Sequence, residues 1–178
     1  MINFTVYSAD CVGNSGNCLY PNKMIVSDKE SFIKATKMDH VTAKYKGNYR
    51  SKDNFESSDC IPLDCDNDHS DNPNEWVTPL DIALEIPGVA FAVSYSRHNN
   101  LPKGDKSARP RFHIFFPIEI VSDEQEYADM KRRIADSFPY YDTNALDSAR
   151  FLYGNNSDEV EFYEGDKTII DYLEEDDF

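Results

Sequence analysis

The sequence predicts an α+β domain, built on a mixed or antiparallel sheet with helices mainly on one face. Helix and strand patterns interleave along the 178 residues, but without the regular rhythm of a doubly wound parallel sheet. About 40% of the residues are hydrophobic, which is enough for a sizeable core. No apolar run reaches the roughly 18 residues that a membrane span requires, so we expect none.

The strand predictions rest on short runs of β-branched and aromatic residues that are bounded by turn-forming residues. The clearest is residues 89–95, Val-Ala-Phe-Ala-Val-Ser-Tyr, which follow Pro87-Gly88. In residues 61–66, Pro62 removes a backbone donor and therefore suggests an edge strand. The predicted strands are residues 4–7, 61–66, 89–95, 111–118, 149–153 and 160–163.

Three helices are predicted from capping residues that are followed by apolar residues at helical spacing. In the middle helix, Thr78 suits the N-cap and Pro79 the first helical position, where its missing N–H is not needed. The apolar face of this helix is expected to be Leu80, Ile82, Ala83 and Leu84. The helices are expected to run from Ser27 or Asp28 to about residue 38, from Thr78 to Pro87, and from Ser122 or Asp123 to about residue 138. Residues 11–22, 44–58 and 97–110 are predicted to be loops or irregular segments.

The net charge of −15 argues against a simple electrostatic DNA-binding module. Ten acids and one lysine lie in residues 158–178 alone. We expect one domain over residues 1–178, with an N-terminal α/β part to about residue 58, a core over 59–155 and an acidic segment over 156–178. This segment is expected either to lead to a further domain of a longer chain or to end a free-standing protein.

Basic residues gather in two patches, and each suits either phosphate binding or a solvated loop surface. The first patch is Lys44, Lys46, Arg50 and Lys52; the second is Arg97, Lys103, Lys106, Arg109 and Arg111.

Cysteine spacing favours reduced thiols in a cytoplasmic protein. Cys11, Cys18, Cys60 and Cys65 do not form the close pairs of a zinc ribbon. A zinc site that uses Cys11, Cys18 and a distant histidine is the alternative. The first residues lack the charged and apolar regions of a signal peptide.

Asp64 and Asp66 are the strongest candidates for metal ligands. Side chains alternate along a strand, so both carboxylates share the face opposite Ile61, Leu63 and Cys65, roughly 6.5–7 Å apart at the backbone. Mg²⁺ or Mn²⁺ would relieve the repulsion between them. The alternative is two exposed acids on an edge strand.

The same aspartates also match the ligand spacing of an EF-hand calcium loop that runs from Asp64 to Glu75. His69 stands where that loop needs glycine for its sharp turn, and Asp71 stands where an apolar residue is usual. Pro62 and its β-type neighbours replace the helix that should enter the loop. The sequence therefore favours the strand-borne pair over the calcium loop.

Two later segments carry further polar candidates. In residues 111–118, Phe112, Ile114 and Phe116 share an apolar face, so Arg111 and His113 point away from the core and suit the oxygens of a triphosphate. In residues 140–154, either Asp142 or Asp147 suits a third metal ligand, and Arg150 suits a phosphate or a structural partner.

Together, the three segments resemble the archaeo-eukaryotic primase superfamily, and most of all the primase-polymerase domains of plasmid, phage and mobile-element replication proteins. The family motifs are hydrophobic-Asp-hydrophobic-Asp, small-x-His and hydrophobic-Asp. They match Leu63-Asp64-Cys65-Asp66, Arg111-Phe112-His113 and Tyr141-Asp142. The resemblance covers about residues 44–154. Arg111 stands where many relatives have a small residue, and Leu146-Asp147 also fits the third motif.

The resemblance implies a two-lobed catalytic core, with an RRM-like sheet and a small N-terminal α/β unit beside it. It implies template-directed nucleotidyl transfer, with NTP or dNTP and single-stranded DNA as partners and two Mg²⁺ or Mn²⁺ ions as cofactors. A helicase or accessory domain in a longer chain is a further expected partner. The expected catalytic residues are Asp64, Asp66, His113 and Asp142. The three aspartates are the expected metal ligands, with Asp147 as the alternative to Asp142. The expected nucleotide contacts are His113, Arg111, Lys103, Lys106, Arg109 and Arg150, and the expected template contacts are Lys44, Lys46, Arg50 and Lys52. A metal-dependent phosphodiesterase or nuclease, and a non-catalytic calcium- or nucleic-acid-binding module, remain alternatives.

Overall fold

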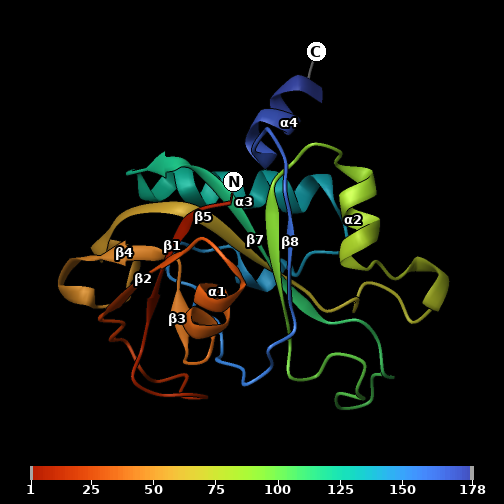
Figure 1. The fold of residues 1–178 in the computed structure, drawn as a ribbon, viewed down its shortest axis with the longest axis horizontal. Coiled ribbons are helices and arrows are strands. Elements are labelled where there is room, and N and C mark those ends of the chain that lie inside the picture. The colour runs from red at the N-terminus through yellow and green to blue at the C-terminus, as the bar shows by residue number, and fades with distance from the viewer. Residues whose placement is uncertain (1, 177–178) are drawn as a thin grey trace.

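The computed structural model describes residues 2–176, which form two antiparallel sheets and four α-helices (Figure 1). The larger sheet holds, in spatial order, β4 (Ala43–Tyr45), β5 (Phe55–Cys65), β7 (Phe112–Val121), β6 (Phe91–Tyr95) and β8 (Val160–Tyr163). The smaller sheet holds β2 (Asn22–Val26), β1 (Phe4–Ser8) and β3 (His40–Val41). The helices are α1 (Lys29–Thr36), α2 (Pro79–Glu85), α3 (Glu124–Ser137) and α4 (Ile169–Asp176). The predicted α+β class, with an antiparallel sheet, is confirmed.

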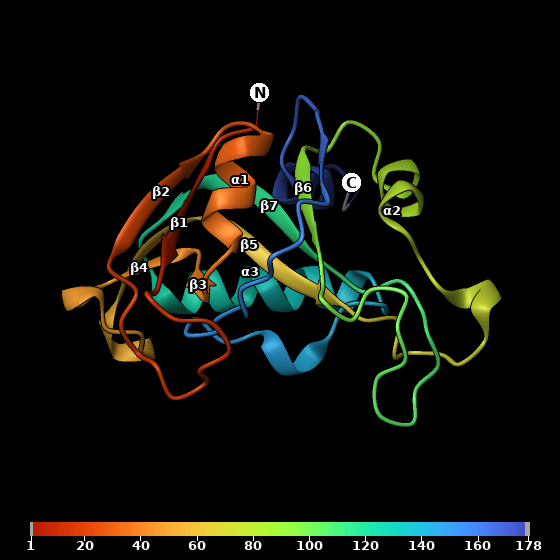
Figure 2. The same cartoon turned by 60° about the horizontal axis from the view of Figure 1, so that its bottom comes forward.

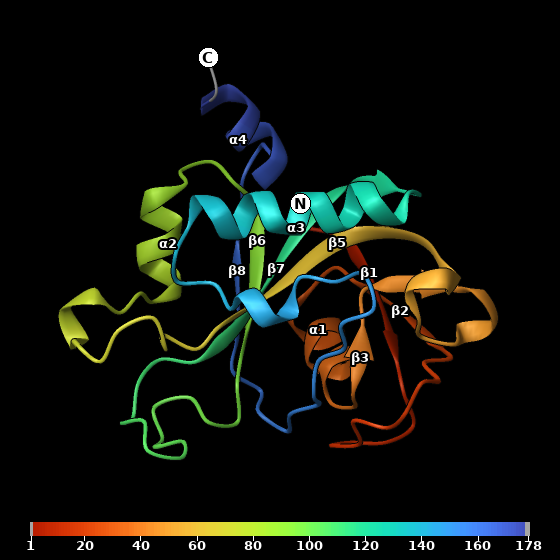
Figure 3. The same ribbon diagram turned by 180° about the vertical axis from the view of Figure 1, so that it is seen from behind.

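The larger sheet is covered on both faces. Side chains of α2, α3 and α4 join one core with Ile114 and Phe116 of β7, and Figure 3 shows α3 lying across β5 and β7. On the other face, Phe115 packs 5.7 Å from Phe4 and 5.1 Å from Phe32, between ring centroids. This second core joins α1 and the smaller sheet to the larger one, as Figure 2 shows from another side. Three of the four helices therefore share a face, as the sequence predicted.

The helix starts follow the predicted capping chemistry. Asp28, Thr78 and Asp123 each accept a hydrogen bond from a backbone N–H in the first turn of their helix. The predicted apolar face of α2 is wrong in part, because Leu80 and Leu84 are 58% and 73% exposed. This short helix touches the core only through one stripe, so two of its leucines face outward.

Several predictions for the remaining elements are wrong. The prediction of an irregular segment over residues 44–58 is wrong at its two ends, where β4 and the first half of β5 pair. Between them, residues 46–54 form two short 3₁₀ helices and turns. Strand β2 and helix α4 are additional elements. Residues 149–153 do not form a strand: within them, Leu152 makes an isolated bridge with His40. None of the helices within residues 2–176 is long and apolar enough to cross a membrane.

Pro62 is tolerated because β4 ends before it. Strand β4 pairs with residues 55–58 of β5, whereas the register between β5 and β7 continues past Pro62 to Cys65. The second half of β5 therefore has one edge free of a neighbouring strand, as the proline suggested.

Candidate active site

Asp64 and His113 face each other on β5 and β7, two neighbouring inner strands of the larger sheet. The register between β5 and β7 pairs the two residues directly, and His113 Nε2 lies 3.0 Å from Asp64 Oδ1. Their strand neighbours Leu63 and Ile114 are buried in the core on the opposite face. The predicted alternation therefore holds on both strands, and it directs this polar pair away from that core.

Asp66 follows the last residue of β5. Its Oδ2 lies 3.9 Å from Lys103 Nζ, and its side chain is 21% exposed. Burial, and next the charge of Asp64, raise the pKa of the Asp66 carboxyl. The second oxygen of Asp64 lies 3.6 Å from Arg150 Nη2. The negative charges of Asp64 and Asp66 are thus partly neutralised by Arg150 and Lys103.

Asp142 lies beside the free edge of β5. Its backbone N–H donates to the carbonyl of Asp64 over 2.9 Å, which fixes the position of the segment. Its side chain accepts from the N–H of Asn144 and so caps the short 3₁₀ helix Thr143–Ala145. Asp147 lies elsewhere, where its carboxylate accepts from the N–H of Ala149. Of the two candidates for the third acid, Asp142 is therefore the one beside the pair.

A cavity of about 290 Å³ collects these side chains. Four of its lining residues are the predicted catalytic residues, and Lys103 and Arg150 line it as well. The full lining is Asp64, Asp66, Ser96, Arg97, His98, Lys103, His113, Asp142, Arg150, Tyr153, Gly154 and Asn155. The sequence places Arg97 only in a basic patch that suits phosphates or solvent, and it assigns no site role to Ser96, His98, Tyr153, Gly154 or Asn155. The pairing of β6 with β7 was the available signal for Ser96, Arg97 and His98, because they directly follow β6.

The donor chemistry of this cavity suits a hard divalent cation. Asp64, Asp66 and Asp142 supply carboxylate oxygens, which Mg²⁺ and Mn²⁺ prefer. Among residues 2–176, however, no three carboxylate, imidazole or thiol groups converge as a preformed metal site. The residue types therefore fit the ion, and ligation by all three acids would require side-chain rotation.

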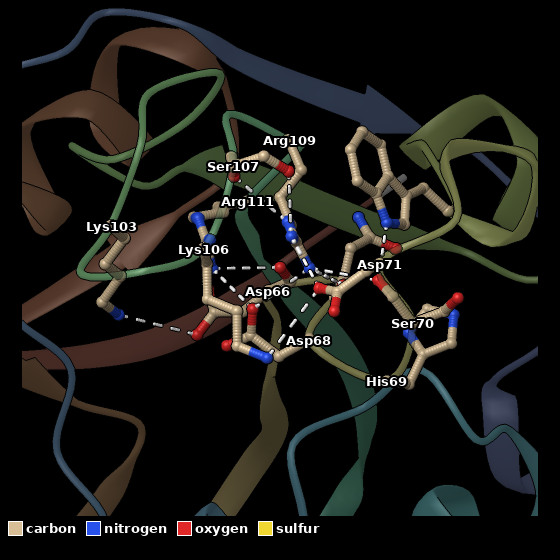
Figure 4. Close-up of polar contacts among 12 residues, drawn as sticks. Asp66, Asp68, His69, Ser70, Asp71, Lys103, Lys106, Ser107, Arg109 and Arg111 are labelled. Carbon is tan, nitrogen blue, oxygen red and sulfur yellow. Dashed lines mark hydrogen bonds and ion pairs between the residues drawn. The ribbon is translucent and has the colours of Figure 1, made fainter.

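Arg109 and Arg111 point into the turn after β5, as Figure 4 shows, and neither lines the cavity. Arg109 Nη1 donates to the carbonyls of Asn67 and Ser70 over 2.9 and 3.1 Å. Arg111 Nη1 donates over 3.1 Å to the carbonyl of Asp66, and over the same distance to a carboxylate oxygen of Asp68. Both guanidinium groups are buried. The hydrogen-bond partners described for these two arginines therefore lie in the turn after β5.

The same turn disfavours the calcium-loop alternative. A strand enters it instead of a helix. Two carboxylates of the turn form ion pairs with arginines. Asp68 contacts Arg111, and Asp71 lies 3.1 Å from Arg109 Nη2. The carbonyl of Ser70 accepts from Arg109 and from the indole N–H of Trp76. Oxygen atoms that a calcium ion would need are thus already hydrogen-bonded to the protein.

The remaining basic candidates are dispersed. Lys106 Nζ lies 3.9 Å from an oxygen of Asp71, outside the cavity. Arg50 donates to the carbonyl of Ala149 over 2.8 Å and stacks on Phe151, which gives it a structural role. Lys44, Lys46 and Lys52 are exposed. A template contact at these three lysines stays a prediction.

The cysteines lie apart from the cavity, and all four are free thiols. Cys60 and Cys65 are buried, and burial raises the pKa of both thiols. Cys11 and Cys18 are partly exposed. No zinc-binding group of three ligands gathers around them within residues 2–176.

No family model matches the sequence, and no curated protein matches it. Among solved structures, the AEP domain (PP-N190) of the primase-polymerase (PrimPol) of cyanophage S-2L is similar, with 11% sequence identity and a TM-score of 0.49. The match covers 92% of this chain and 82% of that domain.

Proposed function

We propose that this chain is a primase-polymerase catalytic domain that carries out template-directed nucleotidyl transfer with Mg²⁺ or Mn²⁺. The observation that supports it most is the single cavity that holds Asp64, Asp66, Asp142 and His113. These residues are also the ones that match the three motifs of the archaeo-eukaryotic primase superfamily. Oxygen ligands beside cationic donors are what a metal–triphosphate complex requires.

The three aspartates would hold the metal ions. When bound, such ions lower the pKa of an attacking 3′-hydroxyl and offset the charge of the leaving pyrophosphate. Asp64 would also orient the imidazole of His113, whose Nε2 it contacts at 3.0 Å. His113, Lys103 and Arg150 would donate to the triphosphate oxygens and offset the charge that develops during transfer.

The partners that follow are an NTP or dNTP and a single-stranded DNA template. Exposed Lys44, Lys46 and Lys52 would contact template phosphates without reading the bases. We infer that residues 2–176 act as one catalytic domain, because side chains from the N-terminal part and from the motif-bearing core share the second core.

Templated synthesis on single-stranded DNA tests the function. We expect the wild-type protein to release pyrophosphate and to make or extend primers with Mg²⁺ or Mn²⁺. Asp64→Asn and His113→Ala should each lower the rate by roughly 100-fold or more, because each removes a polar group at the reacting centre. The matched control is Asp147→Asn, which removes an acid outside the cavity and should keep the wild-type rate.

Equal synthesis by all four proteins would refute the assignment. Template degradation without pyrophosphate release would replace it with the nuclease alternative, because the same acids and histidine can cut as well as join. Melting curves of each variant separate a lost reaction from a lost fold.

A further inference from the structure

We propose that Tyr153 and Arg97 form the subsite for the base of the incoming nucleotide. This inference rests on the proposed function and adds to it the part of the cavity that receives the planar half of the substrate. Both side chains line the same cavity as Asp64 and Asp66. Neither belongs to the motifs that indicated the metal and phosphate chemistry.

The two side chains lie against each other in the cavity. The guanidinium carbon of Arg97 lies over the Tyr153 ring, 5.5 Å from its centroid. Tyr153 is 38% exposed although it is a large aromatic residue, and Arg97 is exposed as well. Phe151 meets the Tyr153 ring edge-on, with centroids 4.9 Å apart. The tyrosine is thus supported from the protein side while part of it remains open.

The backbone on both sides of Tyr153 is fixed. Leu152 exchanges backbone hydrogen bonds with His40, over 2.9 and 3.0 Å. Gly154 donates its N–H over 2.8 Å to Asp39, whose carboxylate is fully buried. A Cβ at position 154 would collide with the carbonyl of Lys37, so glycine is required for this close approach. The backbone that carries the ring is therefore fixed before any ligand arrives, which reduces the entropic cost of stacking on it.

Arg97 is available for a ligand. Within residues 2–176 it makes no ion pair with a carboxylate, in contrast to Lys103 and Arg150, which lie near Asp66 and Asp64. Aromatic rings and the planes of arginine guanidinium groups both stack on nucleobases. The cavity thus has two chemically different parts: carboxylates and a lysine for metal and phosphates, and planar groups for a base.

Stacking also suits the demands of templated synthesis. Every base has a planar face, so a stacking platform accepts all four without reading their hydrogen-bonding edges. A template-directed enzyme needs this tolerance at the incoming nucleotide, because pairing with the template selects the base. The substrate class that follows is any nucleoside triphosphate, bound through its base at Tyr153 and Arg97.

Binding of two ligands with and without a base tests the proposal. We would measure the affinity of the protein for dATP and for tripolyphosphate, each with Mn²⁺, by calorimetry. Tyr153→Leu should weaken dATP binding roughly tenfold and leave tripolyphosphate binding unchanged, because only dATP stacks. Tyr153→Phe keeps the ring and should bind both ligands as the wild type does. Arg97→Lys keeps the charge but loses the plane, so it should weaken dATP more than tripolyphosphate.

Lys103→Ala is the matched control, and it should weaken both ligands alike because it removes a phosphate donor. Equal losses for both ligands in Tyr153→Leu, or no loss, would overturn the base subsite. Loss of affinity for single-stranded DNA alone would assign the platform to the template and also overturn it. If the wild-type protein bound neither dATP nor tripolyphosphate, the proposed function itself would fail.

Discussion

Each carboxylate oxygen of Asp64 has its own cationic or imidazole neighbour. Oδ1 lies 3.0 Å from His113 Nε2, and Oδ2 lies 3.6 Å from Arg150 Nη2. The side chain is only 13% exposed, so these contacts are weakly screened by solvent. We infer that Asp64 both orients the imidazole and anchors the arginine, and that loss of its charge would disturb both neighbours.

Besides His113 and His98, a further histidine, His40, lies near the site and is fully buried. Its Nδ1 lies 2.8 Å from the carbonyl of Met38, which can only accept, so Nδ1 carries the proton. The pKa of His40 is lowered to about 4, mainly by burial and in smaller part by His113, whereas the hydrogen bond to Met38 and the carboxylates of Asp39 and Asp64 raise it. The folded protein therefore keeps this imidazole neutral at pH values where an exposed histidine would be charged.

This predicts an acid-dependent loss of stability. The unfolded chain takes up a proton on His40 near pH 6.5, whereas the folded protein does so only near pH 4, so the free energy of unfolding should fall as the pH decreases between these values. The contribution is on the order of 3 kcal/mol. Asn in place of His40 can keep the hydrogen bond to Met38 without titrating. Urea denaturation at several pH values should show a smaller acid loss in His40→Asn, and an identical loss in both proteins would contradict the assignment.

At the scale of elements, the turn after β5 is the structure that positions Asp66. The chain reverses at Asn67, whose φ of +54° is in the left-handed region and whose side chain bonds to Val77 and Pro110. Arg109 and Arg111, from the segment before β7, hold the carbonyls and carboxylates of the same turn (Figure 4). The two segments are therefore joined by buried guanidinium groups beside the cavity.

We predict that Arg111 acts through the position of Asp66 rather than by contact with a triphosphate. Arg111→Lys keeps the charge but loses the planar donors, so the turn should loosen and the metal requirement should rise. Activity should fall roughly tenfold, with a higher Mn²⁺ concentration for half-maximal rate and little change in the KM for nucleotide. Steady-state kinetics at several Mn²⁺ concentrations test this prediction. A rise in the nucleotide KM alone would contradict it and would indicate that Arg111 contacts the triphosphate.

The elements that the sequence predicted well are those with local signals. The starts of α1, α2 and α3 follow from Asp28, Thr78 and Asp123, whose side chains act within one turn. The first half of β5 was missed because it carries polar residues, and its strand form depends on partners that are distant in sequence. Among these partners are β4 and Thr5, whose N–H and hydroxyl both donate to Asp59.

The site residues likewise divide into those that a local sequence pattern predicts and those that it does not. The motif residues share one cavity because strand alternation and the pairing of Asp64 with His113 follow from simple geometry. Tyr153 enters the cavity through contacts that no short motif encodes, namely the bonds of Gly154 to Asp39 and of Leu152 to His40. Loop conformation is equally hard to predict, which is why the turn contacts of Arg109 and Arg111 were not foreseen.

Over the whole molecule, the site lies on a sheet that is packed on both faces. Successive residues of β7 enter different cores, with Ile114 in one and Phe115 in the other. Such a strand cannot shift its register without moving buried side chains into the wrong core. The pairing of Asp64 with His113 is therefore fixed by packing as well as by their own contact, and this preorganisation is what a catalytic site requires.

Metal-dependent nucleotide binding at Asp66 is the property that separates a nucleotidyl-transfer site from its alternatives. We would record the melting temperature of the wild-type protein, Asp66→Asn and the control Asp147→Asn, each with Mn²⁺ plus dATP and with Ca²⁺ alone. Ligands that bind only the folded state raise the melting temperature. A metal–nucleotide site at Asp66 predicts a rise with Mn²⁺ plus dATP in the wild type and in Asp147→Asn, and little or none in Asp66→Asn. An equal rise in all three proteins, or a full rise with Ca²⁺ alone, would contradict it.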